Sequence, residues 1–162
     1  MAEVVIALGS NLNNPHEQLE IAKEFLKQIS NSEILSSSIY KSEPVGPSED
    51  DFLNAVIKID TDLSPSQLFN RLKKQEKKQG RPSRYPKWTS RTIDLDIIAY
   101  DNLVLETDTL IIPHAEYKYR MFVLLPLKEI FPDWKDVQNA LAIEEMIKKA
   151  PEIRIEKTKL AW

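Results

Sequence analysis

Two acidic residues separated by one position are the part of this chain best suited to chemistry. Residues 91–98 read RTIDLDII, which is rich in Ile and Thr and therefore predicts a β-strand. Because alternate side chains of a strand share a face, Asp94 and Asp96 point to one side and the aliphatic residues to the other. Two carboxylates about 7 Å apart on one strand face repel each other unless a cation lies between them. The pair therefore indicates a Mg²⁺ site, completed by water and substrate phosphates.

The charge around this strand favours the metal site over its alternative, the solvated face of an edge strand. The whole chain has a net charge of −3, yet between residues 70 and 91 Glu76 is the only acid. The basic residues of that stretch are Arg71, Lys73, Lys74, Lys77, Lys78, Arg81, Arg84, Lys87 and Arg91. The lysines at 74, 77 and 78 indicate a solvated helix face. Arginines that flank the acidic strand, at 81, 84 and 91, suit a polyphosphate, because a guanidinium binds phosphate through two parallel hydrogen bonds.

A second set of polar candidates follows the acidic strand. His114 comes directly after Pro113, which favours a turn, and Arg120 lies six residues further on. Beside a polyphosphate site, both are candidate phosphate contacts. Phe122 is either a core residue or a wall of the same site.

Composition narrows the class of protein. The 162 residues suit one domain with a real core, and 42% hydrophobic with 29% charged residues is typical of a globular protein. The net charge argues against nucleic-acid or membrane partners, and there is no Cys for a disulfide or thiolate site. The three glycines fit neither a P-loop nor a dinucleotide-binding turn. The N-terminus resembles no signal peptide, so we expect a cytoplasmic protein.

The elements that must position these residues follow from periodicity and turn signals. Strands are predicted over 3–8, 33–42, 52–60 and the acidic segment, with short strands near 102–105 and 109–112. Helices are predicted over about 15–29, 65–80 and 118–130, the first with a capping box between Asn14 and Glu17. A helix and a strand complete the C-terminus. The first hundred residues thus predict an α+β, ferredoxin-like βαββαβ core, an antiparallel sheet with helices packed on one face, plus C-terminal additions.

Six ordered segments resemble one family, the 6-hydroxymethyl-7,8-dihydropterin pyrophosphokinases of folate biosynthesis. The segments are ALGSN at 7–11, YKSEPVGP at 40–47, FLNAV at 52–56, W-x-x-RTIDLDI at 88–97, IPH at 112–114 and RMFVLLPLKEI at 120–130. Their order and spacing match the family over roughly residues 3–132. The resemblance implies a single pyrophosphokinase domain, 1–162, that transfers pyrophosphate from ATP to the pterin hydroxymethyl group and releases AMP.

The resemblance also implies roles for individual residues. Asp94 and Asp96 would hold two Mg²⁺ ions, and Arg81 and Arg91 would join them as catalytic residues on the triphosphate. The remaining ATP contacts would be Glu76, Ile97, His114 and Arg120. The pterin would be bound by Ser42, Pro44, Val45, Phe52, Asn54, Trp88 and Phe122, with the two phenylalanines on either side of the ring. We expect a monomer whose partners are these small molecules.

Departures from the family pattern fall mainly in loops. The family usually has W-G-P-R where this chain has Thr89 and Ser90 between Trp and Arg. Phe52 replaces a common Tyr, Lys73 stands where a Gln can contact adenine, and Ser83 where a second loop arginine can lie. Ala115 removes a polar side chain beside His114. The metal pair is unchanged.

Three other functions fit parts of the sequence less well. A glycosyltransferase also uses D-x-D, but this chain is short for one and lacks the strand–helix alternation. A ferredoxin-like RNA-binding module would need a basic domain and exposed aromatic residues on a strand. A family member that has lost activity would not be expected to keep Asp94, Asp96, Arg81 and Arg91.

Overall fold

A six-stranded antiparallel sheet forms the centre of the molecule, in a computed structural model that describes residues 1–44, 50–80 and 92–162. Its path runs β5-β1-β4-β3-β8, and β2 pairs with β4 beside β3. The strands are β1 (Ala2–Ser10), β2 (Leu35–Ser36), β3 (Tyr40–Ser42), β4 (Phe52–Thr61), β5 (Asp94–Tyr100) and β8 (Ile155–Lys157). A separate hairpin joins β6 (Leu105–Glu106) to β7 (Ile111–Ile112). The order of the first strands is that of the predicted ferredoxin-like core.

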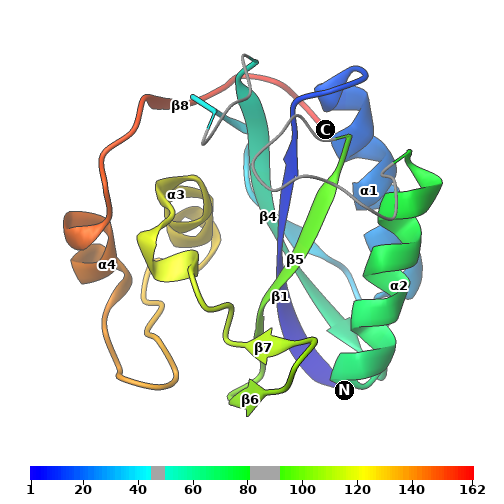
Figure 1. Cartoon of the computed structure of the whole chain (residues 1–162), viewed down its shortest axis with the longest axis vertical. Coiled ribbons are helices and arrows are strands. Elements are labelled where there is room, and N and C mark those ends of the chain that lie inside the picture. Colours follow the sequence, from blue (N-terminus) through cyan, green and yellow to red (C-terminus); the bar gives the residue numbers. More distant parts are fainter. Residues whose placement is uncertain (45–49, 81–91) are drawn as a thin grey trace.

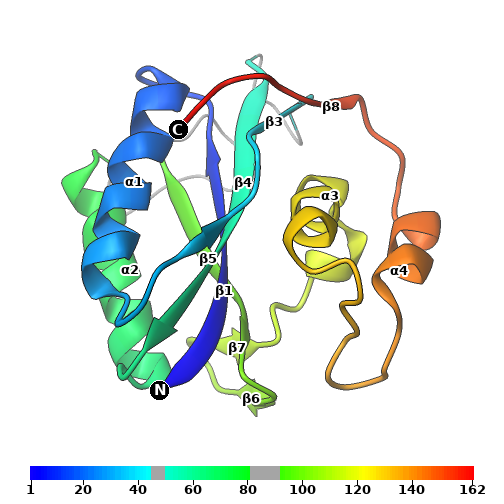
Figure 2. The same ribbon diagram turned by 180° about the vertical axis from the view of Figure 1, so that it is seen from behind.

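Helices cover both faces of this sheet (Figures 1 and 2). One face carries α1 (Pro15–Ile29) and α2 (Pro65–Lys78). The other carries α3 (Met121–Ile130), reached through the 3-10 turn Tyr117–Tyr119, and outside it α4 (Ile143–Lys149). The sequence predicted helices on one face. The C-terminal additions are what supply the second layer.

Strand β1 shows how one sheet serves two cores. Val4, Ile6 and Leu8 are buried against α1 and α2. Val5 and Ala7 are buried in the cluster that contains α3 and α4. Because side chains alternate along a strand, a strand covered on both faces becomes a continuous apolar run, and β1 is the apolar segment VVIAL. The same alternation buries Ile93, Leu95 and Ile97 on the α1–α2 side, as predicted, and turns Asp94 and Asp96 toward α3.

Two local predictions, for the strand at 33–42 and for the start of α1, differ from the structure. The strand predicted over 33–42 is two short strands, β2 and β3, separated by residues 37–39, of which Ser37 still donates its N–H to the Val56 carbonyl of β4. The capping box predicted for α1 is wrong. Asn14 has a left-handed backbone and makes no side-chain cap, and its amide instead donates to the Glu17 carboxylate at 3.0 Å. Helix α2 does have a capping box, between Ser64 and Gln67.

The described helices include none that is long and apolar enough to cross a membrane. The two termini lie at opposite ends of the sheet, and the C-terminal segment runs back along β3 toward α1 (Figure 2).

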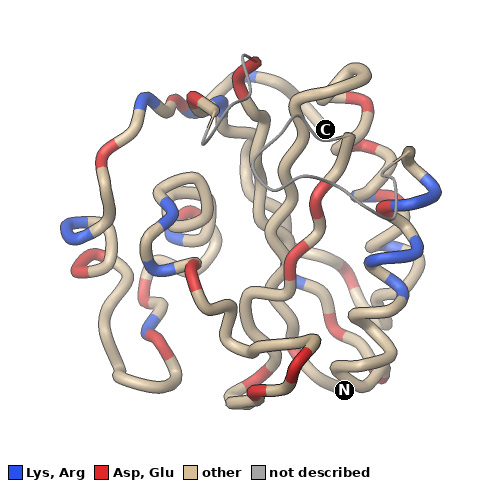
Figure 3. The backbone as a smooth tube through the Cα atoms, in the orientation of Figure 1, with Lys and Arg blue, Asp and Glu red and all other residues tan. Residues whose placement is uncertain are grey.

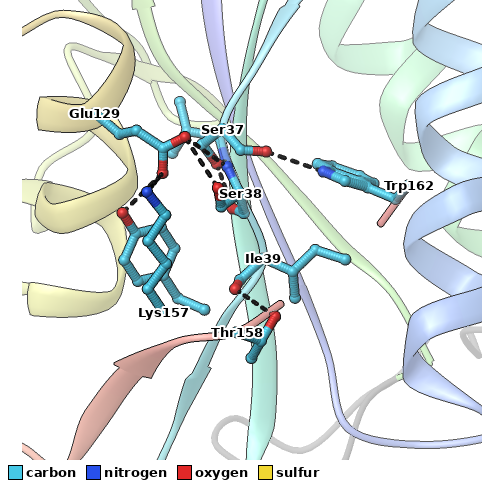
Figure 4. Close-up of polar contacts among 9 residues, drawn as sticks. Ser37, Ser38, Ile39, Glu129, Lys157, Thr158 and Trp162 are labelled. Carbon is cyan, nitrogen blue, oxygen red and sulfur yellow. Dashed lines mark hydrogen bonds and ion pairs between the residues drawn. The ribbon is translucent and has the colours of Figure 1, made fainter. Parts of the chain in front are cut away.

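Glu129 joins α3 to the strands at the sheet edge (Figure 4). Its carboxylate accepts hydrogen bonds from the Ser38 amide at 2.9 Å, the Ser38 hydroxyl at 3.1 Å and the Tyr40 hydroxyl at 2.8 Å. Lys157 of β8 lies 3.7 Å away. Burial alone would raise the pKa of Glu129, but the bonds from Tyr40 and Ser38 outweigh burial and hold it below its ordinary value. The charged form of Glu129 therefore stabilises the packing of α3 against the strands at the sheet edge, and protonation of its carboxylate removes this stabilisation.

We expect the Glu129→Gln variant to lose about 1 kcal/mol of unfolding free energy at pH 7, the scale of one hydrogen bond to a partly exposed charge. A lowered native pKa means that this stability is present above the unfolded value of about 4.3 and is lost as pH falls through the native value. Urea unfolding at pH 7 and pH 3.5 measures the difference, with Glu144→Gln, in a 66% exposed side chain, as control. An equal loss at both pH values would contradict this role for the charge.

Candidate active site

The register of three strands places the polar candidates in one row across the sheet. Asp94 of β5 pairs with Gly9 of β1, and Gly9 pairs in turn with Asn54 of β4. Asn54 pairs with Tyr40 of β3. Because neighbouring strands are about 4.8 Å apart, the acidic position and the amide position lie about 10 Å from each other, with a glycine between them.

A cavity of about 560 Å³ lies over this row, between the sheet and the start of α3. That volume suits a small organic ligand. Nine of the predicted site residues line it: Ser42, Phe52, Asn54, Asp94, Asp96, Ile97, His114, Arg120 and Phe122. These residues come from four separate regions of the sequence, so the fold brings together what the motifs only suggested.

Gly9 forms the floor of the cavity between its two halves. A Cβ atom built there would lie 3.5 Å from Asn54 Oδ1 and 3.8 Å from Phe52 Cδ2. Asn54 is 3% exposed, and its Nδ2 donates to Ser42 Oγ at 2.8 Å and to the Tyr40 carbonyl at 3.4 Å. The side-chain oxygen therefore lies on the glycine side. It is the group with which Asn54 can accept a hydrogen bond from a ligand.

Asp94 and Asp96 form the acidic half of the cavity and lie at the start of β5, along which Figure 3 shows successive acidic positions. Burial and the nearby charge of Asp94 raise the pKa of Asp96 to about 7, against the opposing charges of Lys73 and Arg120. A divalent cation would remove the repulsion. Within residues 1–44, 50–80 and 92–162, no group of three or more His, Cys, Asp or Glu could hold a metal. Two carboxylates in an open cavity fit Mg²⁺, which keeps most of its shell for water and phosphate.

Helix α2 brings a cation to the same half of the cavity. Lys73 lines it, and its ammonium lies 3.2 Å from Glu76 Oε1 and 5.4 Å from the Phe69 ring centroid. Other Lys and Arg positions gather along the outside of α2, away from the sheet (Figure 3). Among the lysines of α2, Lys73 alone lines the cavity, and those at 74, 77 and 78 are exposed, as predicted.

His114 and Arg120 complete the polar lining from the opposite side. Burial and the adjacent Arg120 charge lower the pKa of His114 to about 4, so its ring is neutral at pH 7. His114 Nδ1 accepts the Glu116 backbone N–H at 3.1 Å, which places the ring proton on Nε2. His114 can therefore donate a hydrogen bond to an anion, while Arg120, held by Glu116, supplies charge.

Two phenylalanines line the other half. Phe52 begins β4 on the sheet side, and Phe122 lies in the first turn of α3, with the Arg120 guanidinium 5.8 Å from its ring centroid. Aromatic side chains on two different elements, with an amide between them, are suited to a flat polar ring.

Two described residues among the predicted set, Glu76 and Pro44, are not part of this lining. Glu76 is 2% exposed and lies behind the cavity, where its carboxylate accepts the Leu95 amide at 2.8 Å and holds Lys73. Pro44 follows Glu43, which does line the cavity. Arg81, Arg91, Val45 and Trp88 lie outside the described residues.

Sequence reasoning gave no role to several lining residues. Residues 107–111 of the β6–β7 hairpin reach the cavity, as do Gly9 and Glu116. Lys73, which the sequence indicated only as a departure at an adenine-contact position, also lines it. Gly9 did have a signal, since it lies within one of the ordered motifs. The hairpin residues had none, because a short polar turn in the sequence does not reveal what it packs against.

The chain matches a family model and named relatives over most of its length. The family model described as 7,8-dihydro-6-hydroxymethylpterin-pyrophosphokinase (HPPK) matches residues 5–132. A Haemophilus influenzae protein named 2-amino-4-hydroxy-6-hydroxymethyldihydropteridine pyrophosphokinase is 44% identical over 92% of this chain and 93% of its own length. The Synechocystis protein of the same name is 38% identical over 90% of this chain and 74% of its own length.

Solved structures support the fold. The chain is similar to the Plasmodium falciparum HPPK-DHPS crystal structure with SDX-DHP, with a TM-score of 0.68 and 18% identity over 92% of this chain. It spans 43% of that longer chain, and at this identity the likeness concerns the fold alone.

We expect Asp96→Asn to raise the melting temperature in metal-free buffer at pH 8, because it removes one of two like charges from a half-buried site. A gain of about 1 kcal/mol corresponds to 2–4 °C in a chain of this size. Addition of Mg²⁺ in the millimolar range should raise the melting temperature of the wild type and leave that of Asp96→Asn unchanged. Calorimetric melting measures both, with the exposed Asp133→Asn as control. An equal Mg²⁺ response in the two proteins would exclude a metal at this pair.

Proposed function

Since this chain belongs to the 7,8-dihydro-6-hydroxymethylpterin-pyrophosphokinase family, we propose that the cavity over Gly9 is where it transfers pyrophosphate from ATP to a pterin. The activity is that of a Mg²⁺-dependent pyrophosphokinase of folate biosynthesis. It moves the β- and γ-phosphates of ATP onto the hydroxymethyl group of 6-hydroxymethyl-7,8-dihydropterin and releases AMP. ATP is the co-substrate.

The observation that carries this proposal is the division of one cavity into two halves. Asp94 and Asp96 line the acidic half, and Phe52 and Asn54 the aromatic and amide half, with Gly9 between them. Pyrophosphate transfer needs this arrangement, because the hydroxymethyl oxygen on the flat ring must reach the β-phosphorus of the triphosphate while the bond from that phosphorus to AMP breaks. Bringing the two reactants together accounts for much of the rate of such a transfer.

In the acidic half, Asp94 and Asp96 would hold two Mg²⁺ ions, which neutralise charge on the phosphates. The His114 Nε2–H and the Arg120 guanidinium, which also line the cavity, would bind phosphate oxygens. Arg81 and Arg91, outside the described residues, remain proposed triphosphate ligands, and Glu76 acts on the nucleotide through Lys73. These groups stabilise charge that develops as the bond to AMP breaks.

In the other half, the pterin ring would lie between Phe52 and Phe122 and over Gly9. Asn54 would accept a ring N–H through Oδ1, because its Nδ2 is held by Ser42 and the Tyr40 carbonyl. Pro44, Val45 and Trp88 are proposed to complete this half. We further propose that residues 1–162 act as a single domain, as a monomer and in the cytoplasm.

Nucleotide product analysis tests the function directly. We expect AMP to form only when ATP, 6-hydroxymethyl-7,8-dihydropterin and Mg²⁺ are all present, and to disappear when the metal is chelated. Formation of ADP would instead mean transfer of a single phosphoryl group, and a nucleoside diphosphate released from a sugar nucleotide would mean a glycosyltransferase.

A substitution at Gly9, on the floor of the cavity, tests where the pterin ring binds. In Gly9→Ala the new methyl group makes ordinary van der Waals contacts, so we expect the variant to fold with a melting temperature close to that of the wild type. The methyl group occupies space under the ring, and losing about 1.4 kcal/mol of ring contact would raise the KM for the pterin about tenfold. The KM for ATP should change less than twofold. Steady-state kinetics with each substrate varied in turn measures both, and an unchanged pterin KM would remove Gly9 from the ring site.

A further inference from the structure

Arg154 connects a segment outside the matched family region to both ends of the β3–β4 connection. Its guanidinium donates two parallel hydrogen bonds to Asp51, at 2.9 and 3.0 Å. Its backbone N–H donates to Glu43 Oε1 at 2.7 Å, and its carbonyl accepts the Glu43 N–H at 2.9 Å. One residue thus holds the position just after β3 and the position just before β4.

Glu43 and Asp51, the two residues that Arg154 contacts, lie next to the ring half of the cavity, which is the half lined by Phe52, Asn54 and Phe122. Glu43 lines the cavity itself and follows Ser42, which binds the Asn54 amide. Asp51 directly precedes Phe52, whose side chain is a wall of the cavity. The neighbouring strand ends are paired through Ser42 and Phe52. A shift of either end would therefore move the groups proposed to bind the pterin.

The position of Arg154 does not depend on its own side chain. Strand β8, which begins at the next residue, pairs with β3 over three residues. Beyond it, Thr158 donates through both its backbone N–H and its hydroxyl to the Ile39 carbonyl, at 2.9 and 2.8 Å, and Trp162 Nε1 donates to the Ser37 carbonyl at 2.9 Å (Figure 4). Removing the guanidinium therefore leaves the C-terminal segment attached.

The ion pair between Arg154 and Asp51 is too exposed to contribute much to folding stability. The Arg154 side chain is 66% exposed and that of Asp51 21% exposed. Exposed ion pairs contribute little to folding, although the two-bond geometry of Arg with a carboxylate fixes direction well. The hydrogen bond from Arg154 lowers the pKa of Asp51, so the pair is charged at neutral pH.

We propose that Arg154 is a positioning residue for the pterin half of the site. It holds Glu43 and Asp51 so that Ser42 and Phe52 are already in place before the ring binds. This rests on the proposed function, because it assumes that the ring half takes a pterin. The benefit is preorganisation: a side chain that is already ordered costs less on binding.

Steady-state kinetics of Arg154→Gln tests the proposal in the full chain. We expect the KM for 6-hydroxymethyl-7,8-dihydropterin to rise about 3- to 10-fold, the cost of ordering one or two side chains. The KM for ATP, the kcat at saturation and the melting temperature should stay near wild-type values.

Arg154→Lys keeps the positive charge but cannot donate two parallel hydrogen bonds to Asp51, so its pterin KM should lie between those of the wild type and Arg154→Gln. Asp51→Asn should resemble Arg154→Gln, and the double variant should be no worse than either, because both break the same contact.

Lys148→Gln is the matched control, since it removes an exposed cation from another ion pair, with Glu145, and should leave both KM values unchanged. A wild-type pterin KM in Arg154→Gln, alongside normal AMP formation by the wild type, would overturn this proposal alone. Equal rises in both KM values with a lower melting temperature would overturn it too, in favour of a purely structural role. A wild type that forms no pterin-dependent AMP would overturn the proposed function and this inference with it.

Discussion

The register of β1 between β5 and β4 is the constraint on which the site depends. It places an acidic residue, a glycine and an amide side by side on three strands, and the alternation of β-strands turns all three positions toward α3. A shift of one residue in the β1–β5 pairing would turn the carboxylates to the face that buries Leu95 and Ile97, and the same shift in the β1–β4 pairing would turn Asn54 away from the cavity. Burial of the aliphatic side chains on the opposite face, such as Leu95 and Ile97, therefore fixes the register that brings the three site positions together.

The second constraint is electrostatic. The site places Asp96 beside Asp94 in partly dehydrated surroundings, which is unfavourable in the empty protein. Lys73 and Arg120 offset part of this cost, and a divalent cation would offset more. The buried Glu76 carboxylate accepts hydrogen bonds from the Leu95 backbone N–H of β5 and from the Lys73 ammonium of α2. It therefore fixes the position of Lys73 relative to the acidic strand. Strain of this kind is expected where binding, rather than folding, completes the charge balance.

Much of this architecture was predictable from the chain. The apolar runs, the alternation around Asp94 and the helix signals determine the βαββαβ core, because they reflect local backbone preferences and burial. The split of 33–42 into β2 and β3 was missed, since periodicity does not report where a ladder is interrupted. The Asn14 cap failed because the backbone there adopts a left-handed conformation that the sequence pattern did not reveal. Nine predicted site residues, all within the ordered motifs, line the cavity. The contacts of the hairpin at 107–111, of Lys73 and of Arg154 arise from the tertiary fold, which sequence spacing cannot show.

The two faces of the sheet also differ in when the chain can complete them. Most of the core on the face covered by α1 and α2 comes from the first hundred residues, and Ile112 and Trp162 add to it later in the chain. The opposite wall of the cavity, with His114, Arg120 and Phe122, comes from residues made afterwards. The edge that carries Arg154 is later still. During synthesis, most of the α1–α2 face would therefore be available before the opposite wall of the cavity, and substrate binding would have to wait for His114, Arg120 and Phe122.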